Sequence, residues 1–261
     1  GLPEDKARAC LNDPAGITTY SLLGTDHGYR LLWIIPASTI LLVQFHLMAM
    51  RIGAASGKGF VGAIRARWGH RWGYFAVVGL LLANFGTICA EYAGVAAACS
   101  LAGIPAWISV PLAAVLISLV VVLGSFHRVE RVLLVVSATL ALYIVDGIVA
   151  QPDWSRVWHY AFVPHLPHDT VGWIAVAAAL GTTLAPWGLA FIQSYAVDKK
   201  ITLANLRFER VDVVIGSLLT GIIGLAIAIA CAATLHRAGV HINDARDAAI
   251  ALRPLAGSFA T

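Results

Sequence analysis

The sequence has 261 residues, of which 59% are hydrophobic and 12% are charged, with a formal net charge of +4. The charged fraction is about half that of an average soluble domain, which excludes an ordinary soluble fold and indicates a protein embedded in lipid. The basic residues lie in short loops between apolar runs and form no single patch, so the positive charge follows membrane topology and predicts no nucleic-acid partner.

Seven apolar segments are predicted to be transmembrane helices, because they are bounded by glycine, proline or charge clusters and a bilayer core takes roughly 20 residues of helix. The segments are Asp13–Leu23, Arg30–Met50, Trp72–Leu101, Pro105–Phe126, Arg131–Ala150, Thr170–Val197 and Val211–Leu235. The polar residues 1–12 have no apolar core, so they form neither a signal peptide nor a complete span. After the second segment, Lys58–Trp68 is predicted to be a short amphipathic helix at the membrane surface.

Lysine and arginine gather on alternate sides of the predicted spans. They follow the second, fourth and sixth segments, whereas the intervening loops carry few basic residues. By the positive-inside rule we expect a multi-pass protein of the cell membrane with a cytoplasmic N-terminus, an extracellular loop at 151–169 and an extracellular tail at 236–261. The lipid bilayer is therefore its expected surroundings.

Two motifs place proline and glycine at membrane depth: Asp13-Pro14-Ala15-Gly16 opens the first segment, and Ala185-Pro186-Trp187-Gly188 lies in the middle of the sixth. Proline removes a backbone donor and glycine tolerates non-helical angles, so each motif can interrupt its helix and free carbonyl oxygens. A pair of interrupted spans at corresponding positions of two repeats points to the midplane site of a transporter. On spacing alone, two ordinary proline kinks remain the alternative.

Three carboxyl groups are candidates for a functional role. Asp13 can supply a hard oxygen ligand for a divalent cation, although an aspartate before proline is also a good helix N-cap. Glu91 lies deep in the third segment, where an ionisable group usually faces a polar cavity or a partner. A hydrogen-bonded structural carboxyl is the alternative for Glu91. Asp146 lies near the outer end of its segment and can reach interfacial water.

Other chemistry has little support in the sequence. The histidines show no HExxH pattern and no i,i+4 pair on one helix, so we expect most of them in loops or at interfaces. The cysteines Cys10, Cys89, Cys99 and Cys231 form no CxxC pair, which predicts neither a disulfide nor a cysteine metal site. No nucleophile and base recur at catalytic spacing, so we do not expect an enzyme.

On these motifs the chain resembles the Nramp transporters, whose first helix carries Asp-Pro-Gly-Asn and whose sixth carries Met-Pro-His. Further similar stretches are Gly24–Trp33, Ala55–Lys58, Ala90-Glu91 with Gly94, and Arg210–Val213. The resemblance implies an all-α membrane protein with part of the LeuT-type fold, in which two inverted five-helix repeats hold the metal at the broken helices 1 and 6. It implies a divalent metal ion as substrate, no cofactor, and a metal site at Cys10, through its carbonyl, Asp13, Gly16, Glu91, Thr182, Ala185 and Gly188.

Four positions depart from the family pattern. Gly16 replaces an asparagine, Ala185 the metal-binding methionine, Trp187 a histidine and Ile88 an aspartate associated with proton movement. This pattern resembles the Nramp-related magnesium transporters. Loss of the soft thioether and gain of space suit Mg²⁺, which keeps several waters, with Mn²⁺ also passing. Loss of the titratable side chains implies transport uncoupled from protons, whereas a proton-coupled Mn²⁺/Fe²⁺ carrier is the alternative.

The resemblance also implies the organisation of the chain. Residues 1–12 stand where the apolar half of helix 1 is expected, residues 13–150 form the first repeat with helices 1b to 5, and residues 170–235 begin the second repeat with helices 6 and 7. Because three helices of the second repeat are not represented, a fragment or a truncated, non-transporting relative is a further expectation.

Overall fold

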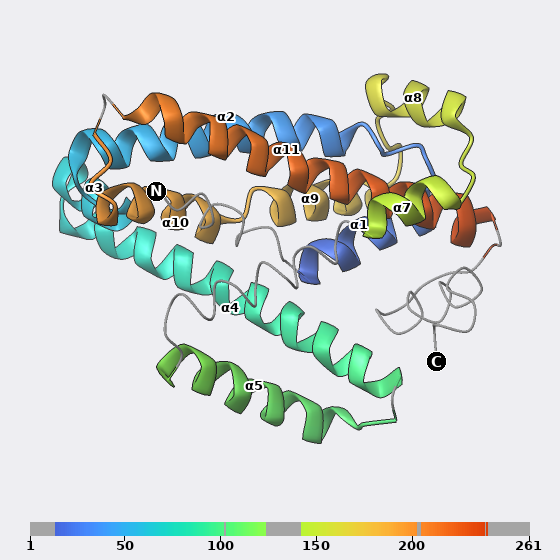
Figure 1. Ribbon diagram of the computed structural model, residues 1–261, viewed down its shortest axis with the longest axis horizontal. Coiled ribbons are helices and arrows are strands. Elements are labelled where there is room, and N and C mark those ends of the chain that lie inside the picture. Colours follow the sequence, from blue (N-terminus) through green and yellow to red (C-terminus); the bar gives the residue numbers. More distant parts are fainter. Residues whose placement is uncertain (1–13, 102, 124–141, 203–204, 238, 240–261) are drawn as a thin grey trace.

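The computed structural model describes residues 14–101, 103–123, 142–202, 205–237 and 239, and all regular structure within them is helical (Figure 1). The first half of the chain contributes α1 (Pro14–His27), α2 (Ile34–Ser56), α3 (Phe60–Trp68), α4 (His70–Leu101) and α5 (Ala106–Leu123). The second half contributes α7 (Leu142–Val149), α8 (Trp154–Phe162), α9 (Thr170–Thr183), α10 (Pro186–Asp198), α11 (Leu206–Cys231) and the π-helical turn η2 (Ala232–His236).

Helices α2 and α11 pack side by side along the long axis of the molecule and form the scaffold of the bundle (Figure 1). Helix α1 packs on α11 and α9, while α10 packs on α2 toward the end that also carries α3. Helix α4 runs diagonally across α1 and α10, and α5 lies outside α4. Elements from the two halves of the chain therefore interleave around α2 and α11.

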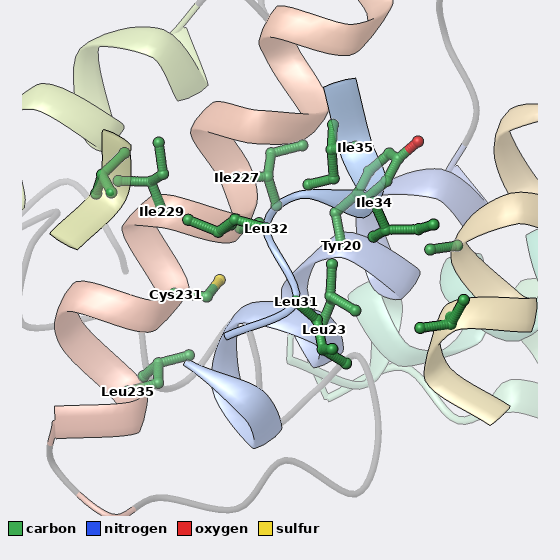
Figure 2. Packing of buried hydrophobic residues seen from close by; sticks show 14 residues of the cluster. Tyr20, Leu23, Leu31, Leu32, Ile34, Ile35, Ile227, Ile229, Cys231 and Leu235 are labelled. Carbon is green, nitrogen blue, oxygen red and sulfur yellow. The ribbon is translucent and has the colours of Figure 1, made fainter. Parts of the chain in front are cut away.

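Two apolar clusters hold this scaffold together. The larger one lies where α1, α2 and α11 meet, and Figure 2 shows Tyr20, Leu32, Ile35 and Ile227 converging there. The smaller one lies toward the other end, where Met50 of α2 packs with neighbours on α10 and α11. Ile35 and Met50 are each 1% exposed, so α2 has buried side chains in both clusters.

Small residues let α1 approach α11 closely. A Cβ atom added to Gly24 would overlap the carbonyl oxygen of Ala228 on α11, and one added to Gly224 would come within 2.7 Å of the Tyr20 ring. Close approach of this kind replaces the hydrophobic effect as a source of packing energy in lipid. Glycine at these two positions is therefore part of the α1–α11 interface.

The predicted class, an all-helical integral membrane protein, is confirmed. Within the described residues, four stretches are long and apolar enough to cross a membrane: Ile34–Ser56, His70–Ala96, Thr170–Asp198 and Glu209–His236. They match the second, third, sixth and seventh predicted segments. Large apolar side chains on α4 and α5 face outward, and Leu82 is 69% and Trp107 76% exposed, which suits contact with lipid.

The other three predicted segments are not among these four stretches. The apolar stretch of the fourth covers Ala106–Val120, and the first begins as α1 at Pro14. The fifth is described only at its end, as α7, and its earlier part lies outside the described residues.

Two of the polar connections are helical. The helix predicted over Lys58–Trp68 is present as α3, Phe60–Trp68, and its place at the membrane surface stays a prediction. The loop predicted at 151–169 contains α8, which the sequence analysis missed because this helix is short. Asp153 caps α8 by accepting a hydrogen bond from the Arg156 backbone N–H at 3.3 Å, and Val157 and Ala161 are buried. The cap and the packing of α8 on α2 stabilise a helix too short to form alone.

Candidate functional site

The sixth predicted segment is interrupted where the Pro-x-Gly motif predicts. Helix α9 ends at Thr183, and α10 begins at Pro186. Ala185 has φ −56° and ψ 130°, which is not helical. The residue before a proline is pushed out of the helical region, and proline itself fits the first position of the next helix. Carbonyl groups in the last turn of α9 therefore have no continuing helix to accept from.

A cavity of about 100 Å³ adjoins this break. Its walls come from α1, α2, the α9–α10 junction and α11. Four of the predicted metal-site residues line it together: Gly16, Thr182, Ala185 and Gly188. The fold therefore brings the start of α1 against the break in the sixth span, although the two motifs are far apart in the sequence.

The other three predicted site residues are not among those lining this cavity. Cys10 and Asp13 lie outside the described residues, so their roles stay predictions. Asp13 directly precedes Pro14, the first residue of α1. Glu91 lies on α4, and the described cavity wall does not include it, so the arrangement gives no direct support to its predicted place in the site.

One hydrogen bond joins α1 to the end of α9 at the cavity wall. The Tyr20 hydroxyl lies 2.6 Å from Thr183 Oγ1, and Thr183 donates its own proton to the Ala179 carbonyl at 2.7 Å. The Tyr20 hydroxyl is therefore the donor to Thr183. Both side chains are buried, so this bond holds the end of α9 against α1.

Sequence reasoning missed the polar residues that α2 and α11 contribute to the cavity. They are His46, Asp212, Ser217 and Thr220. The search for histidine pairs at metal-ligand spacing could not find them, because they come from two separate helices. A different signal was present, since an ionisable side chain inside a membrane span is itself a pointer to a polar pathway.

The cavity favours a cation. Among the described residues that line it, Asp212 carries the only formal charge, and there is no lysine or arginine. Trp187 also lines it, and its indole Nε1 is buried without a hydrogen-bond partner in the described part of the chain. A buried indole N–H usually has a partner. Taken together, the side chains of the wall supply hydroxyl groups, one carboxyl group and one imidazole, and the remaining space is left by small residues.

Comparison with known proteins gives consistent matches. The family profile Nramp, "Natural resistance-associated macrophage protein-like", matches residues 7–261. The chain is 25% identical over 260 residues to the divalent metal cation transporter MntH of Caldanaerobacter subterraneus, covering 95% of this chain and 61% of that protein. It is 30% identical over 267 residues to the MntH of Deinococcus radiodurans, covering 95% of this chain and 59% of that protein.

Solved structures agree with the fold. Crystal structures of two variants of a manganese transporter from Eremococcus coleocola superpose with a TM-score of 0.73 at 23% identity, covering 89% of this chain and 51% of theirs. The LeuT-type helical arrangement is therefore shared. The chain spans about three fifths of the length of the curated relatives it matches, at 61% and 59%.

Proposed function

This chain belongs to the Nramp family, and from that premise we propose that it forms the ion-binding part of a divalent-cation transporter. The observation that carries the proposal is the cavity at the α9–α10 break, where Gly16, Thr182, Ala185 and Gly188 meet. The cation is the substrate and not a cofactor. Residues 13–150 act as the first repeat and residues 170–235 as the start of the second, with the N-terminus and the α10 end on the cytoplasmic side.

The proposed ligands are oxygen atoms from both sides of the cavity. Asp13 supplies a carboxylate and Cys10 a carbonyl just before α1, while the end of α9 near Thr182 and Ala185 supplies carbonyl groups freed by the break. Hard oxygen ligands of this kind suit Mg²⁺ and Mn²⁺. The position of Gly16 on the cavity wall supports a site next to the first turn of α1.

The space in the cavity supports Mg²⁺ as a substrate, as in the Nramp-related magnesium transporters. Gly16 and Ala185 present only a hydrogen and a methyl group to a cavity of about 100 Å³. A single water needs roughly 10–15 Å³ by this measure, so several waters fit. Mg²⁺ dehydrates reluctantly and keeps several waters, whereas Mn²⁺ binds the same oxygen ligands at least as well.

We further propose that cation transport is not coupled to proton movement. The indole of Trp187 on the cavity wall cannot exchange a proton at physiological pH, and Ile88 on α4 is 50% exposed and apolar. A second candidate function is a proton-coupled manganese transporter, and the superposed structures of a manganese transporter favour Mn²⁺ as its ion. The two candidates differ in ion preference and in proton movement.

Ion competition in proteoliposomes tests the proposal. The full-length protein is expected to take up Mn²⁺, and a large excess of Mg²⁺ is expected to suppress this uptake. Asp13→Asn should abolish uptake because it removes the charged ligand, while Asp198→Asn, at the exposed end of α10, should leave it unchanged. Mn²⁺ uptake that is indifferent to excess Mg²⁺ would refute the magnesium assignment, and wild-type rates in Asp13→Asn would refute the site.

A further inference from the structure

The cavity continues beyond the helix break toward α10 and the first half of α11. On this side its polar wall is formed by His46 of α2 together with Asp212 and Ser217 of α11. None of these residues belongs to the two interrupted motifs. They therefore form a group separate from the proposed ligands at Gly16 and Ala185.

The imidazole of His46 is oriented by a neighbour on α11. His46 Nδ1 lies 3.3 Å from Ser217 Oγ, and Ser217 is 4% exposed. When Nδ1–H donates to this hydroxyl, Nε2 presents its lone pair on the opposite side of the ring. Metal-binding histidines are held in this way, because the hydrogen bond of one ring nitrogen sets the tautomer and direction of the other.

The space in front of His46 Nε2 is bounded by a glycine. A Cβ atom added to Gly188 would lie 3.5 Å from Nε2, its nearest contact outside the adjoining residues and the α10 backbone. His46 Nε2 makes no hydrogen bond to any described residue. The lone pair therefore faces the first turn of α10 across room that no side chain fills.

We propose that His46 Nε2 and the Asp212 carboxylate form a second cation site on the α10 side of the break, occupied by divalent transition-metal ions on their way through the cavity. This inference rests on the proposed function and adds a substrate class to it. Imidazole suits first-row transition metals, whereas Mg²⁺ takes oxygen ligands and keeps its waters. The site therefore acts on Mn²⁺ and not on Mg²⁺.

Pulsed EPR of Mn²⁺ bound to the detergent-solubilised full-length protein tests the inference directly. Coupling of the Mn²⁺ electron spin to a ¹⁴N nucleus is expected in the wild type and should vanish in His46→Gln. His159→Gln, on the outer helix α8, is the matched control and should retain the coupling. Asp212→Asn should weaken Mn²⁺ binding about tenfold or more, the scale on which metal sites respond to loss of supporting groups.

A variant that leaves the histidine in place separates ligation from folding. In Gly188→Ala the new methyl group sits at ordinary van der Waals distance from Nε2, so the fold should be kept while the space for a metal ion is filled. This variant should also lose the ¹⁴N coupling. His46→Gln should slow Mn²⁺ uptake in proteoliposomes while Mg²⁺ uptake stays at the wild-type rate.

The outcomes distinguish the two proposals. If the wild type takes up Mn²⁺ but shows no ¹⁴N coupling, or if His46→Gln and Gly188→Ala retain it, the second site is refuted and the transport function stands. If the wild type takes up neither ion, the transport function is refuted whatever the EPR spectra show.

Discussion

The hydrogen bond between Tyr20 and Thr183 should stabilise the junction of α1 with the end of α9. The two side chains come from the two halves of the chain and meet at 2.6 Å in a buried position. Tyr20→Phe removes the donor, Thr183→Val removes the acceptor, and the double variant removes both. A double-mutant cycle on these three variants isolates the energy of the pair.

The expected magnitudes follow from which hydrogen bonds each variant removes. Tyr20→Phe should cost about 1 kcal/mol, because Thr183 keeps its bond to the Ala179 carbonyl. Thr183→Val should cost about 1–3 kcal/mol, because it removes both the bond from the Tyr20 hydroxyl and the bond to the Ala179 carbonyl. The double variant leaves neither group, so its cost should fall below the sum by about 0.6–1.7 kcal/mol, the range for side-chain hydrogen bonds between membrane helices.

Reversible unfolding of the full-length protein in mixed micelles measures these differences. Thr234→Val is the matched control, since Thr234 also donates to a carbonyl one turn earlier, that of Ala230, at 2.7 Å. The loss of unfolding free energy in Thr234→Val should add to the loss in Tyr20→Phe within about 0.5 kcal/mol. Strict additivity for Tyr20→Phe and Thr183→Val would show that the bond contributes nothing and would refute the reasoning.

Three further predictions concern packing, selectivity and coupling. Gly24→Ala should destabilise the bundle by about 1–3 kcal/mol, because its methyl group meets the α11 backbone. Thermal unfolding measures this loss. Gly86→Ala is the control, because a methyl group there meets no neighbouring element within 4 Å and should change the stability by no more than about 0.5 kcal/mol. Restoring a thioether and a carboxamide through Ala185→Met with Gly16→Asn should shift uptake toward Mn²⁺ and weaken Mg²⁺ uptake, and unchanged competition would count against two lost ligands. Metal uptake should leave the lumen pH unchanged, because Trp187 carries no titratable proton, and a pH-sensitive dye inside the vesicles would reveal metal-dependent acidification if this is wrong.

Local properties of the chain were enough to predict the membrane class, the helix α3 and the break in the sixth span. Each depends on a few neighbouring residues. A long uncharged run has to lie in lipid, and the ring of Pro186 disfavours a helical conformation at Ala185, the residue before it. The resemblance to the Nramp family also named Gly16, Thr182, Ala185 and Gly188, and the cavity brings these four together. Helix α8 was not predicted from the sequence, because the stability of this helix comes from an N-cap and from packing on α2.

Only the tertiary structure decided which distant side chains share the cavity. His46, Asp212 and Ser217 stand on two helices, and their spacing in the sequence carries no ligand pattern. They line the same cavity because α2 and α11 pack side by side and because the first turn of α10 contains a glycine. The sequence by itself determined where helices form and where one must break, since those choices are made within a few residues. The rotation of each helix about its axis, and with it the polar wall of the cavity, is set by packing across the whole bundle.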